Sequence, residues 1–485
     1  MGKGVRDHSY IGKGNGLFSN FPTLQSLGLK GVARMYLSLS GDICAGLRDL
    51  AAKDGWLESP HKRFAPNNKK GTPMDTLELP FSSWLNAPAH RAWLLAEGRR
   101  LLAFAKASRL AEGFGNLDER GQLADDAMAE TMNTARMTHS FAMAHIQGIP
   151  GCLGLVDHGV AALWGPLRDA VHGGWYAVPD HRDGNSGKAA YLHAFVALAA
   201  SSAVVAGSAD APRLLTEAIR VLETHFWSEE EGTLRESFVR DWQQEEAYRG
   251  ANSNMHGTEA FLALADVTGD SRWLDRALRI VERVIHDHAA ANDFMVIEHF
   301  DRQWQPLREY NHDNPADGFR PYGTTPGHGF EWARLVLHLE AARRQAGLFT
   351  PDWLLNDARG LFDSACRHGW HADGTPGIVY TLDWDNRPVV RQRLHWTHAE
   401  ASATAAALLR RTGEAQYETW YRRFWDFIEV HFIDLELGSW HHELDEHNRP
   451  DARIWGGKPD LYHAFQAVLL PGLPLAPSLA SALAR

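Results

Sequence analysis

Five histidines recur along the chain at intervals of roughly 63 to 72 residues, each near the start of an expected helix: His193, His256, His328, His398 and His463. An imidazole has a reference pKa of about 6.5, so it can take up and return a proton near neutral pH. Removing a proton from a carbon beside an aldehyde requires such a base. The regular spacing therefore predicts that these side chains converge on one site that moves protons.

Carboxylates accompany two of these histidines at helical spacing. Glu259 follows His256 by three residues, and Glu331 follows His328 by three. Residues three apart lie on one face of a helix, so each carboxylate can approach its imidazole. Such a contact fixes the tautomer of the imidazole and raises its basicity. The spacing predicts two histidine–carboxylate pairs in the site.

Aromatic and cationic residues extend this pattern. Trp396 and Glu400 are four apart and can share a helix face, and Arg136 stands at the corresponding place in the preceding repeat. The chain holds 18 Trp residues, and an indole face packs well against a sugar ring. An arginine stabilises negative charge that develops on oxygen atoms. Together these residues favour a neutral, polyhydroxylated substrate.

Each feature also has an ordinary structural explanation. A single histidine in a helix is most often a satisfied buried or surface residue, and the spacing His-x-x-Glu is common. The carboxylates leave open a glycoside hydrolase or lyase, and a non-catalytic sugar-binding protein is a further alternative. Histidine clusters can bind zinc, but the motif HExxH is absent and no cysteine lies close by. The sequence therefore predicts no metal site.

The elements that position these residues form a repeat of helix, glycine-containing turn, helix and short hairpin. The segment AFLALADVTGDSRWLDRALRIVERVIHDH from Ala260 shows the apolar periodicity of two amphipathic helices. Hairpins with a spacing of roughly 60 residues are expected from Gly173, Gly232, Asp293, Gly377 and Gly438. About six such helix pairs would close into an all-α (α/α)6 barrel, and an open solenoid is the alternative.

Two segments interrupt this repeat. The insertion PLREYNHDNPADGFRPYGTTPG from Pro306 is rich in Pro, Gly and Asn, which predicts a lid or binding loop. Residues 1–80 lack the periodicity, so we expect a poorly ordered or extra N-terminal extension before a catalytic barrel at 81–485.

Composition excludes several classes of protein. The net charge of −11 and the scarcity of Lys/Arg clusters argue against nucleic-acid binding, and no apolar run is long enough to span a membrane. Cys44, Cys152 and Cys366 are scattered, which is typical of a reducing compartment such as the cytoplasm. The oligomeric state stays open.

Four motifs resemble a known family. They are P-G-H-x-x-E at Pro326–Glu331, N-M-H-x-x-E-A at Asn254–Ala260, W-x-x-x-E at Trp396–Glu400 and K-x-D-x-Y-H at Lys458–His463. These resemble the N-acylglucosamine 2-epimerase superfamily, which folds as an (α/α)6 barrel. Further segments such as TARM and GGWYA resemble its aldose–ketose isomerase branch, the mannose and sulfoquinovose isomerases.

The resemblance implies roles for particular residues and implies no metal and no cofactor. His328 and His463 would be the acid–base pair, with Glu331 supporting His328. Arg136 and His256 would hold sugar hydroxyls, with Trp396 and Glu400 as further substrate contacts. The repeat pattern adds His193 to the substrate-binding set.

The resemblance also implies a reaction, the interconversion of D-mannose and D-fructose, or of D-lyxose and D-xylulose, through a cis-enediol. A sugar 2-epimerase, acting on mannose or N-acylglucosamine, stays open as an alternative. Sulfoquinovose isomerases differ from this chain at Met132, Gly318, His442 and Pro459, so a sulfonated substrate is less expected.

Overall fold

The computed structural model describes residues 79–80, 82–179 and 186–485. The chain divides into two compact units, and the second, Leu77–Arg485, contains every element discussed below. The predicted extension at 1–80 falls almost wholly outside the described residues, so its extent and order stay predictions.

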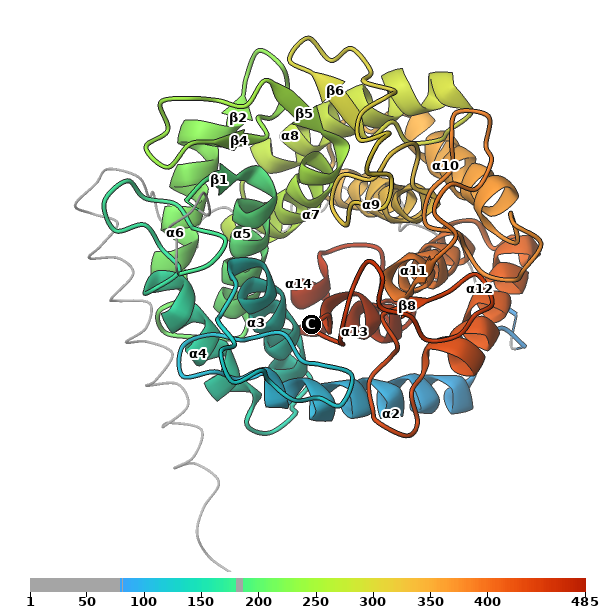
Figure 1. The fold of residues 1–485 in the computed structure, drawn as a ribbon, viewed down its shortest axis with the longest axis horizontal. Helices are drawn as coiled ribbons and strands as arrows, with labels where there is room; N and C mark the ends of the chain where they lie inside the picture. The colour runs from blue at the N-terminus through green and yellow to red at the C-terminus, as the bar shows by residue number, and fades with distance from the viewer. Residues whose placement is uncertain (1–78, 81, 180–185) are drawn as a thin grey trace, which may run out of the picture. The chain divides into compact units, whose positions relative to one another are not determined.

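A closed ring of inner helices forms the centre of the second unit (Figure 1). Each helix packs against the next, and the last returns to the first, which excludes an open solenoid. The inner helices are α3 (Thr131–Ile146), α5 (Ala190–Val205), α7 (Ala251–Thr268), α9 (Pro326–Gln345), α11 (His395–Thr412) and α13 (Tyr462–Leu469).

A second layer of helices surrounds this ring. Each outer helix packs against an inner neighbour, and α2 packs against α13. The outer helices are α2 (Pro88–Ala105), α4 (Cys152–Trp164), α6 (Ala211–Val221), α8 (Arg272–Val281), α10 (Trp353–Gly369) and α12 (Ala415–Phe427). The expected (α/α)6 barrel is confirmed.

The sequences of the two layers explain their places. Outer helix α8 buries one stripe, formed by Trp273, Leu274, Ala277, Ile280 and Val281, and keeps charged residues on its other face. Inner helix α5 is buried on nearly all sides. Its many Ala and Ser side chains are small enough for neighbouring helices to approach closely.

Short antiparallel strand pairs connect the repeats. Strands β1 (Lys188–Ala189), β5 (Tyr248–Gly250) and β7 (Arg393–Leu394) each lead into an inner helix. They pair with β4 (Ser237–Phe238), β6 (His299–Asp301) and β8 (Glu443–Leu444), which belong to the next repeat. A local pair joins β2 (Trp227–Ser228) and β3 (Thr233–Leu234). Several of the predicted hairpins close with single bridges, such as Leu382 to Pro388 and Leu444 to Pro450.

The carboxyl-terminal helix α14 (Leu479–Leu483) packs against α3, α5 and α7, inside the ring of Figure 1. Within the described residues, no helix combines the length and the apolar character needed to cross a membrane.

Candidate functional site

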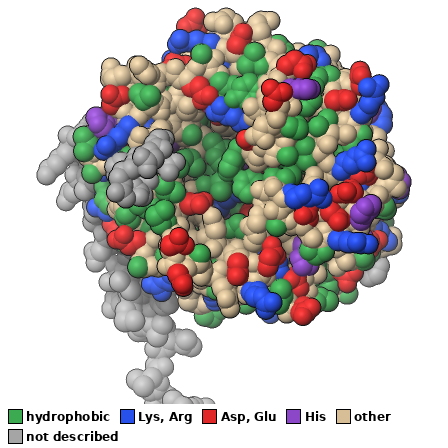
Figure 2. All heavy atoms as spheres, viewed as in Figure 1, with side chains coloured by type: hydrophobic (Ala, Val, Ile, Leu, Met, Phe, Trp, Pro, Cys, Tyr) green, Lys and Arg blue, Asp and Glu red, His purple; other side chains and the backbone are tan. Residues whose placement is uncertain are grey.

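A cavity of about 290 Å³ lies at the starts of the inner helices. On the face drawn in Figure 2, the centre of the ring is hollowed. The volume is close to the lower end of typical small-molecule sites, about 300–1,000 Å³, and suits a single sugar.

The cavity wall is built in two layers that follow the helix period. The second residues of five inner helices line it, namely Met132, Tyr191, Asn252, Trp396 and His463. Four residues further on, one helical turn deeper, the sixth residues Arg136, His256 and Glu331 also line the cavity. The sixth residues of the other two helices lie behind them, Phe195 against His256 and Glu400 against His463. Since the helices begin at one level of the ring, equal positions in different helices converge.

His328 faces this cavity and is oriented by a buried carboxylate. Its Nδ1 lies 2.9 Å from Oε1 of Glu298, which precedes β6. An ionised carboxylate can only accept, so Nδ1 carries the hydrogen and Nε2 is left for the substrate. The predicted support by Glu331 is not found in this geometry, because Glu298 occupies the place beside Nδ1.

His463 is held in the same manner. Its Nδ1 lies 3.1 Å from Oε1 of Glu400, whose other oxygen accepts a 2.7 Å hydrogen bond from Arg334 Nε. Burial lowers the pKa of His463, while the charge of Asp460 and the contact with Glu400 act in the opposite direction. Burial alone would raise the pKa of Glu400, but Arg334 and His463 hold it below its ordinary value. Its Nε2 makes no hydrogen bond to any of the described residues.

Glu331 differs from the other carboxyl groups. Its Oε1 lies 3.6 Å from Arg334 and 3.8 Å from His256, beyond hydrogen-bond range. Burial raises its pKa well above the ordinary value, and the neighbouring charge of Glu400 raises it further. Burial and the neighbouring carboxylate thus disfavour the charged form of Glu331, while Arg334 acts in the opposite direction.

Arg136 and His256 lie on the floor of the cavity. Arg136 donates to Tyr191 Oη at 2.9 Å and to Asp460 Oδ2 at 3.3 Å. Burial lowers the pKa of His256 to about 4, so the imidazole is neutral. Tyr462 donates a hydrogen bond to Oε2 of Glu259. The same oxygen lies 3.6 Å from Nδ1 of His256. The floor thus offers both a permanent cation and a neutral imidazole to hydroxyl groups.

Aromatic rings enclose the substrate space. The Trp396 ring lies 5.1 Å from the His328 ring and 5.8 Å from the His463 ring, centroid to centroid. The predicted binding loop contributes Gly318 and Phe319 to the wall. A Cβ on Gly318 would lie 2.8 Å from Trp455, so a larger side chain there would displace that indole. Met132, His442 and Pro459, the other positions that differ from sulfoquinovose isomerases, also line the cavity.

His193 and His398 are not brought to this cavity. Nε2 of His193 accepts the Trp175 N–H at 3.1 Å, and Nδ1 donates to the Ala189 carbonyl at 2.7 Å. His398 repeats this arrangement with Ile378 and Leu394. Both imidazoles tie a loop to the start of an inner helix, so the predicted substrate contact of His193 has no support in its geometry.

Sequence reasoning missed several residues that complete the site. They are Glu298, Arg334, His395 and Asp460. Asp460 lies three residues before His463, inside the motif K-x-D-x-Y-H that was already noted, and Glu298 lies in the segment Ile297–Asp301 after the hairpin start at Asp293. Arg334 follows Glu331 by three residues, a spacing that predicts an ion pair on one helix face.

Two groups of side chains in the site bring potential metal ligands within 4.8 Å of one another. They are His256, Glu259 and Glu331, and Glu331, Glu400 and His463. Arg334 already pairs with Glu400 and lies 3.6 Å from Glu331, so a second cation would meet repulsion there.

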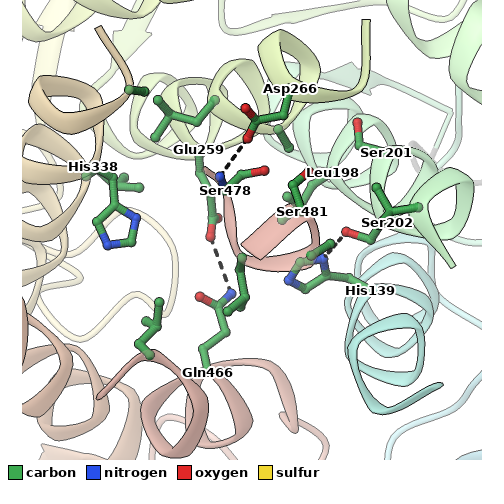
Figure 3. Close-up of a pocket in the computed structure, with 18 of the residues that line it drawn as sticks. His139, Leu198, Ser201, Ser202, Glu259, Asp266, His338, Gln466, Ser478 and Ser481 are labelled. Carbon is green, nitrogen blue, oxygen red and sulfur yellow. Dashed lines mark hydrogen bonds between the residues drawn. The ribbon is translucent and has the colours of Figure 1, made fainter. Parts of the chain in front are cut away.

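A second, smaller cavity of about 30 Å³, which we call the axial cavity, lies deeper along the inner helices (Figure 3). Its wall includes His139, Glu259 and Arg334, each the ninth residue of its helix, and is closed by Ser478–Ser481. Figure 3 shows Gln466 bonded to Glu259 and His139 bonded to Ser202. Burial lowers the pKa of His139 to about 4 and that of His338 to about 3. The volume holds about two water molecules.

Comparison with known proteins gives consistent matches. A family model described as N-acylglucosamine 2-epimerase matches residues 113–467. A D-mannose isomerase of Pseudomonas cannabina pv. alisalensis is 70% identical over 85% of this chain and 99% of that protein. A D-mannose isomerase of Thermobifida fusca is 52% identical over 83% of this chain and 98% of its own length. A crystal structure of D-mannose isomerase superposes with a TM-score of 0.72 at 29% identity, covering 79% of this chain and 99% of that one.

Proposed function

The chain belongs to the N-acylglucosamine 2-epimerase family, and on that premise we propose that it is an aldose–ketose isomerase that interconverts D-mannose and D-fructose. The observation that carries this proposal is the pair His328 and His463. Both face one cavity of about 290 Å³, and a carboxylate at Nδ1 leaves each Nε2 free.

In the proposed reaction, His463 carries the proton between carbon atoms. Nε2 removes the proton from C2 of the open-chain aldose, the C–H electron pair forms the C1=C2 bond, and the π pair of the C1=O bond moves onto O1, whose protonation gives a cis-enediol. The same nitrogen then returns the proton to C1. Since the imidazole ends as it began, the step needs no oxidant or reductant. Glu400 and Arg334 keep the ring oriented throughout.

His328 acts on oxygen atoms in this scheme. It opens the pyranose ring by exchanging protons between O1 and O5, and it then helps to move the proton from O2 to O1. The Glu331 carboxyl group, in the protonated form that its burial favours, and the Arg136 guanidinium stabilise negative charge on these oxygens as it develops in this scheme.

Incubation with mannose in deuterium oxide, followed by NMR, tests the proposal. Fructose carrying partial deuterium at C1 is expected. Glucose as the main product would instead indicate C2 epimerisation, and release of a sugar from a glycoside would indicate a hydrolase. No conversion of mannose or lyxose would refute the isomerase proposal.

Four residues of the cavity wall differ from those of sulfoquinovose isomerases, namely Met132, Gly318, His442 and Pro459. This difference favours mannose over sulfoquinovose as the substrate, so kcat/KM should be far higher for mannose. A reversed preference would assign the protein to the sulfosugar branch. We also propose that catalysis needs no metal or cofactor. We further propose that the protein is located in the cytoplasm, which cell fractionation can test.

A further inference from the structure

Asp460 lies in the cavity wall where three groups that can carry positive charge meet. Its Oδ2 is 3.3 Å from Arg136 Nη1, 3.7 Å from His395 Nε2 and 3.8 Å from His463 Nε2. Its Oδ1 accepts the backbone N–H of His463 at 3.3 Å, at the start of α13. With 13% of its side-chain surface exposed, the carboxylate is largely removed from water.

Asp460 interacts with the His463 ring through its charge and not through a hydrogen bond. At 3.8 Å, Oδ2 is too far from Nε2 for a hydrogen bond, so the lone pair of that nitrogen remains available. A charge pair at the same distance in a site screened from water is still strong. The hydrogen bond from Arg136 restrains the carboxylate from turning onto Nε2.

We propose that Asp460 is a positioning residue whose charge stabilises His463 in its protonated form, while Arg136 holds the carboxylate away from the reacting nitrogen. The inference rests on the proposed isomerase function, in which Nε2 receives the C2 proton. When that proton arrives, an N–H bearing positive charge faces a carboxylate that is already in place. The enediol intermediate is thereby stabilised without a change in the geometry of the site.

Other charged and titratable groups also face His463, from four inner helices and one loop. They are Arg136 on α3, His256 on α7, Glu331 on α9, His395 and Glu400 on α11, and His442 before β8. Replacing Asp460 by Asn leaves all of these in place and keeps an oxygen that can accept the His463 N–H. The Asp460→Asn variant therefore removes one charge and, because an amide nitrogen takes the place of Oδ2, the hydrogen bond that Arg136 donates.

Kinetics of Asp460→Asn test the proposal. Without the carboxylate, the pKa of His463 falls further below its ordinary value. We expect the acid limb of kcat/KM to move to lower pH by about one unit. We expect kcat to fall about tenfold, because a shift of one pKa unit is a tenfold change in the equilibrium constant for protonation of His463. Asp460→Glu should restore part of the acid limb, and Asp266→Asn, at the axial cavity, should leave both quantities unchanged. An unshifted acid limb would overturn the proposal.

A titration without substrate separates this inference from the proposed function. In protein labelled with ¹⁵N-histidine, the His463 signals are assigned by their loss in His463→Gln. They should titrate at lower pH in Asp460→Asn than in the wild-type protein, whether or not mannose is converted. Identical titration curves would overturn the inference even if isomerase activity is found. A shifted curve without mannose conversion would support Asp460 as the charge partner of His463 and would refute mannose as the substrate.

Discussion

The cavity that holds His328 and His463, which we call the catalytic cavity after its proposed function, and the axial cavity lie along the same inner helices. Both contain histidines and carboxylates, yet they differ in how these groups are held. In the catalytic cavity, Glu298 and Glu400 each accept from Nδ1 of an imidazole whose Nε2 is free. In the axial cavity, His139 Nδ1 bonds the hydroxyl of Ser202, and its Nε2 has no hydrogen-bond partner among the residues that the structure describes. The axial space of about 30 Å³ admits water but no sugar.

The difference shows that residue type alone does not make a proton-transfer site. An imidazole becomes a useful base when a carboxylate orients it and an adjoining space admits substrate. Glu259 and Arg334, which line the axial cavity, lie 3.6 Å from His256 and from Glu331 of the catalytic cavity, respectively. The boundary between the two regions is therefore a single layer of side chains.

The largest expected effect is a loss of activity on replacing His463 of the catalytic cavity, which replacement of His139 of the axial cavity should not cause. His463→Ala should reduce kcat by about 10⁴-fold, the upper end for general acid–base catalysis, because no other group is proposed to take the C2 proton. His139→Ala should retain activity. Deuterium exchange at C2 should be lost in His463→Ala and should persist slowly in His328→Ala. The opposite exchange result would swap the roles of the two histidines.

Loss of an orienting carboxylate should have a smaller effect. Glu298→Gln should lower kcat by about 10²-fold, because the amide no longer fixes the tautomer of His328. A matched control is Asp357→Asn, which alters a similar contact of 2.8 Å to His286 outside the cavity. Equal losses of activity in the two variants would show that the Glu298 contact has only a structural role.

Loss of a loop-anchoring histidine should affect stability rather than binding. His193→Ala leaves the buried Trp175 N–H unpaired, which should lower the free energy of unfolding by about 1–3 kcal/mol. The KM for mannose should stay unchanged, whereas His256→Asn should raise it. Urea denaturation measures the free energy of unfolding, and steady-state kinetics measure KM. A raised KM in His193→Ala would show that His193 contributes to substrate binding.

The same anchoring histidines predict a pH dependence of stability. Burial lowers the pKa of His193 and of His398 to about 3, so both are neutral in the folded protein. The unfolded chain binds these protons below about pH 6.5. The stability due to the neutral imidazoles is therefore complete above pH 6.5 and declines as pH falls toward 3, by up to about 1.4 kcal/mol per unit for each histidine. Denaturation curves in which His193→Ala shows the same pH slope as the wild-type protein would contradict this assignment.

The pH dependence of catalysis should follow His463. This base must be neutral in the free enzyme, so kcat/KM should fall as pH drops through its pKa. Because burial lowers that pKa, the acid limb should lie below pH 6.5. A pH profile with its acid limb well above 6.5 would show that another group limits the reaction.

Removal of metal ions should have no effect. Although two groups of side chains bring potential ligands together, Arg334 supplies positive charge beside their shared member Glu331. Activity is expected to survive dialysis against EDTA. Loss of activity that zinc or manganese restores would reverse this prediction.

The periodicity of the sequence was sufficient to predict the barrel, and six of the eight residues predicted for the site line its cavity. It could not separate His193 and His398 from the other repeated histidines. Both are the fourth residue of their helix, whereas His463 is the second, His328 the third and His256 the sixth. At about 100° per residue, positions two, three and six point to one side and position four points away. Helix starts read from sequence are uncertain by more than one residue, which is enough to lose this distinction.

The partners Glu298 and Asp460 were missed for a different reason. Each lies in a loop or at a helix boundary, where no periodicity specifies the direction of a side chain. Glu331 was paired with His328 on helical spacing, yet a carboxylate from the preceding loop occupies the available nitrogen. Contacts between distant segments of the chain depend on the closed ring, which spacing along one helix does not describe.

The closure of the ring between α13 and α3 has a consequence for biosynthesis. His463 enters the site on the last inner helix, more than 300 residues after Arg136 on the first. As the ribosome extends the chain, the earlier helices hold an unfinished ring whose apolar inner surfaces face water. Contacts of such large sequence separation form slowly. The nascent protein is therefore both inactive and prone to aggregation until Tyr462–Leu469 docks.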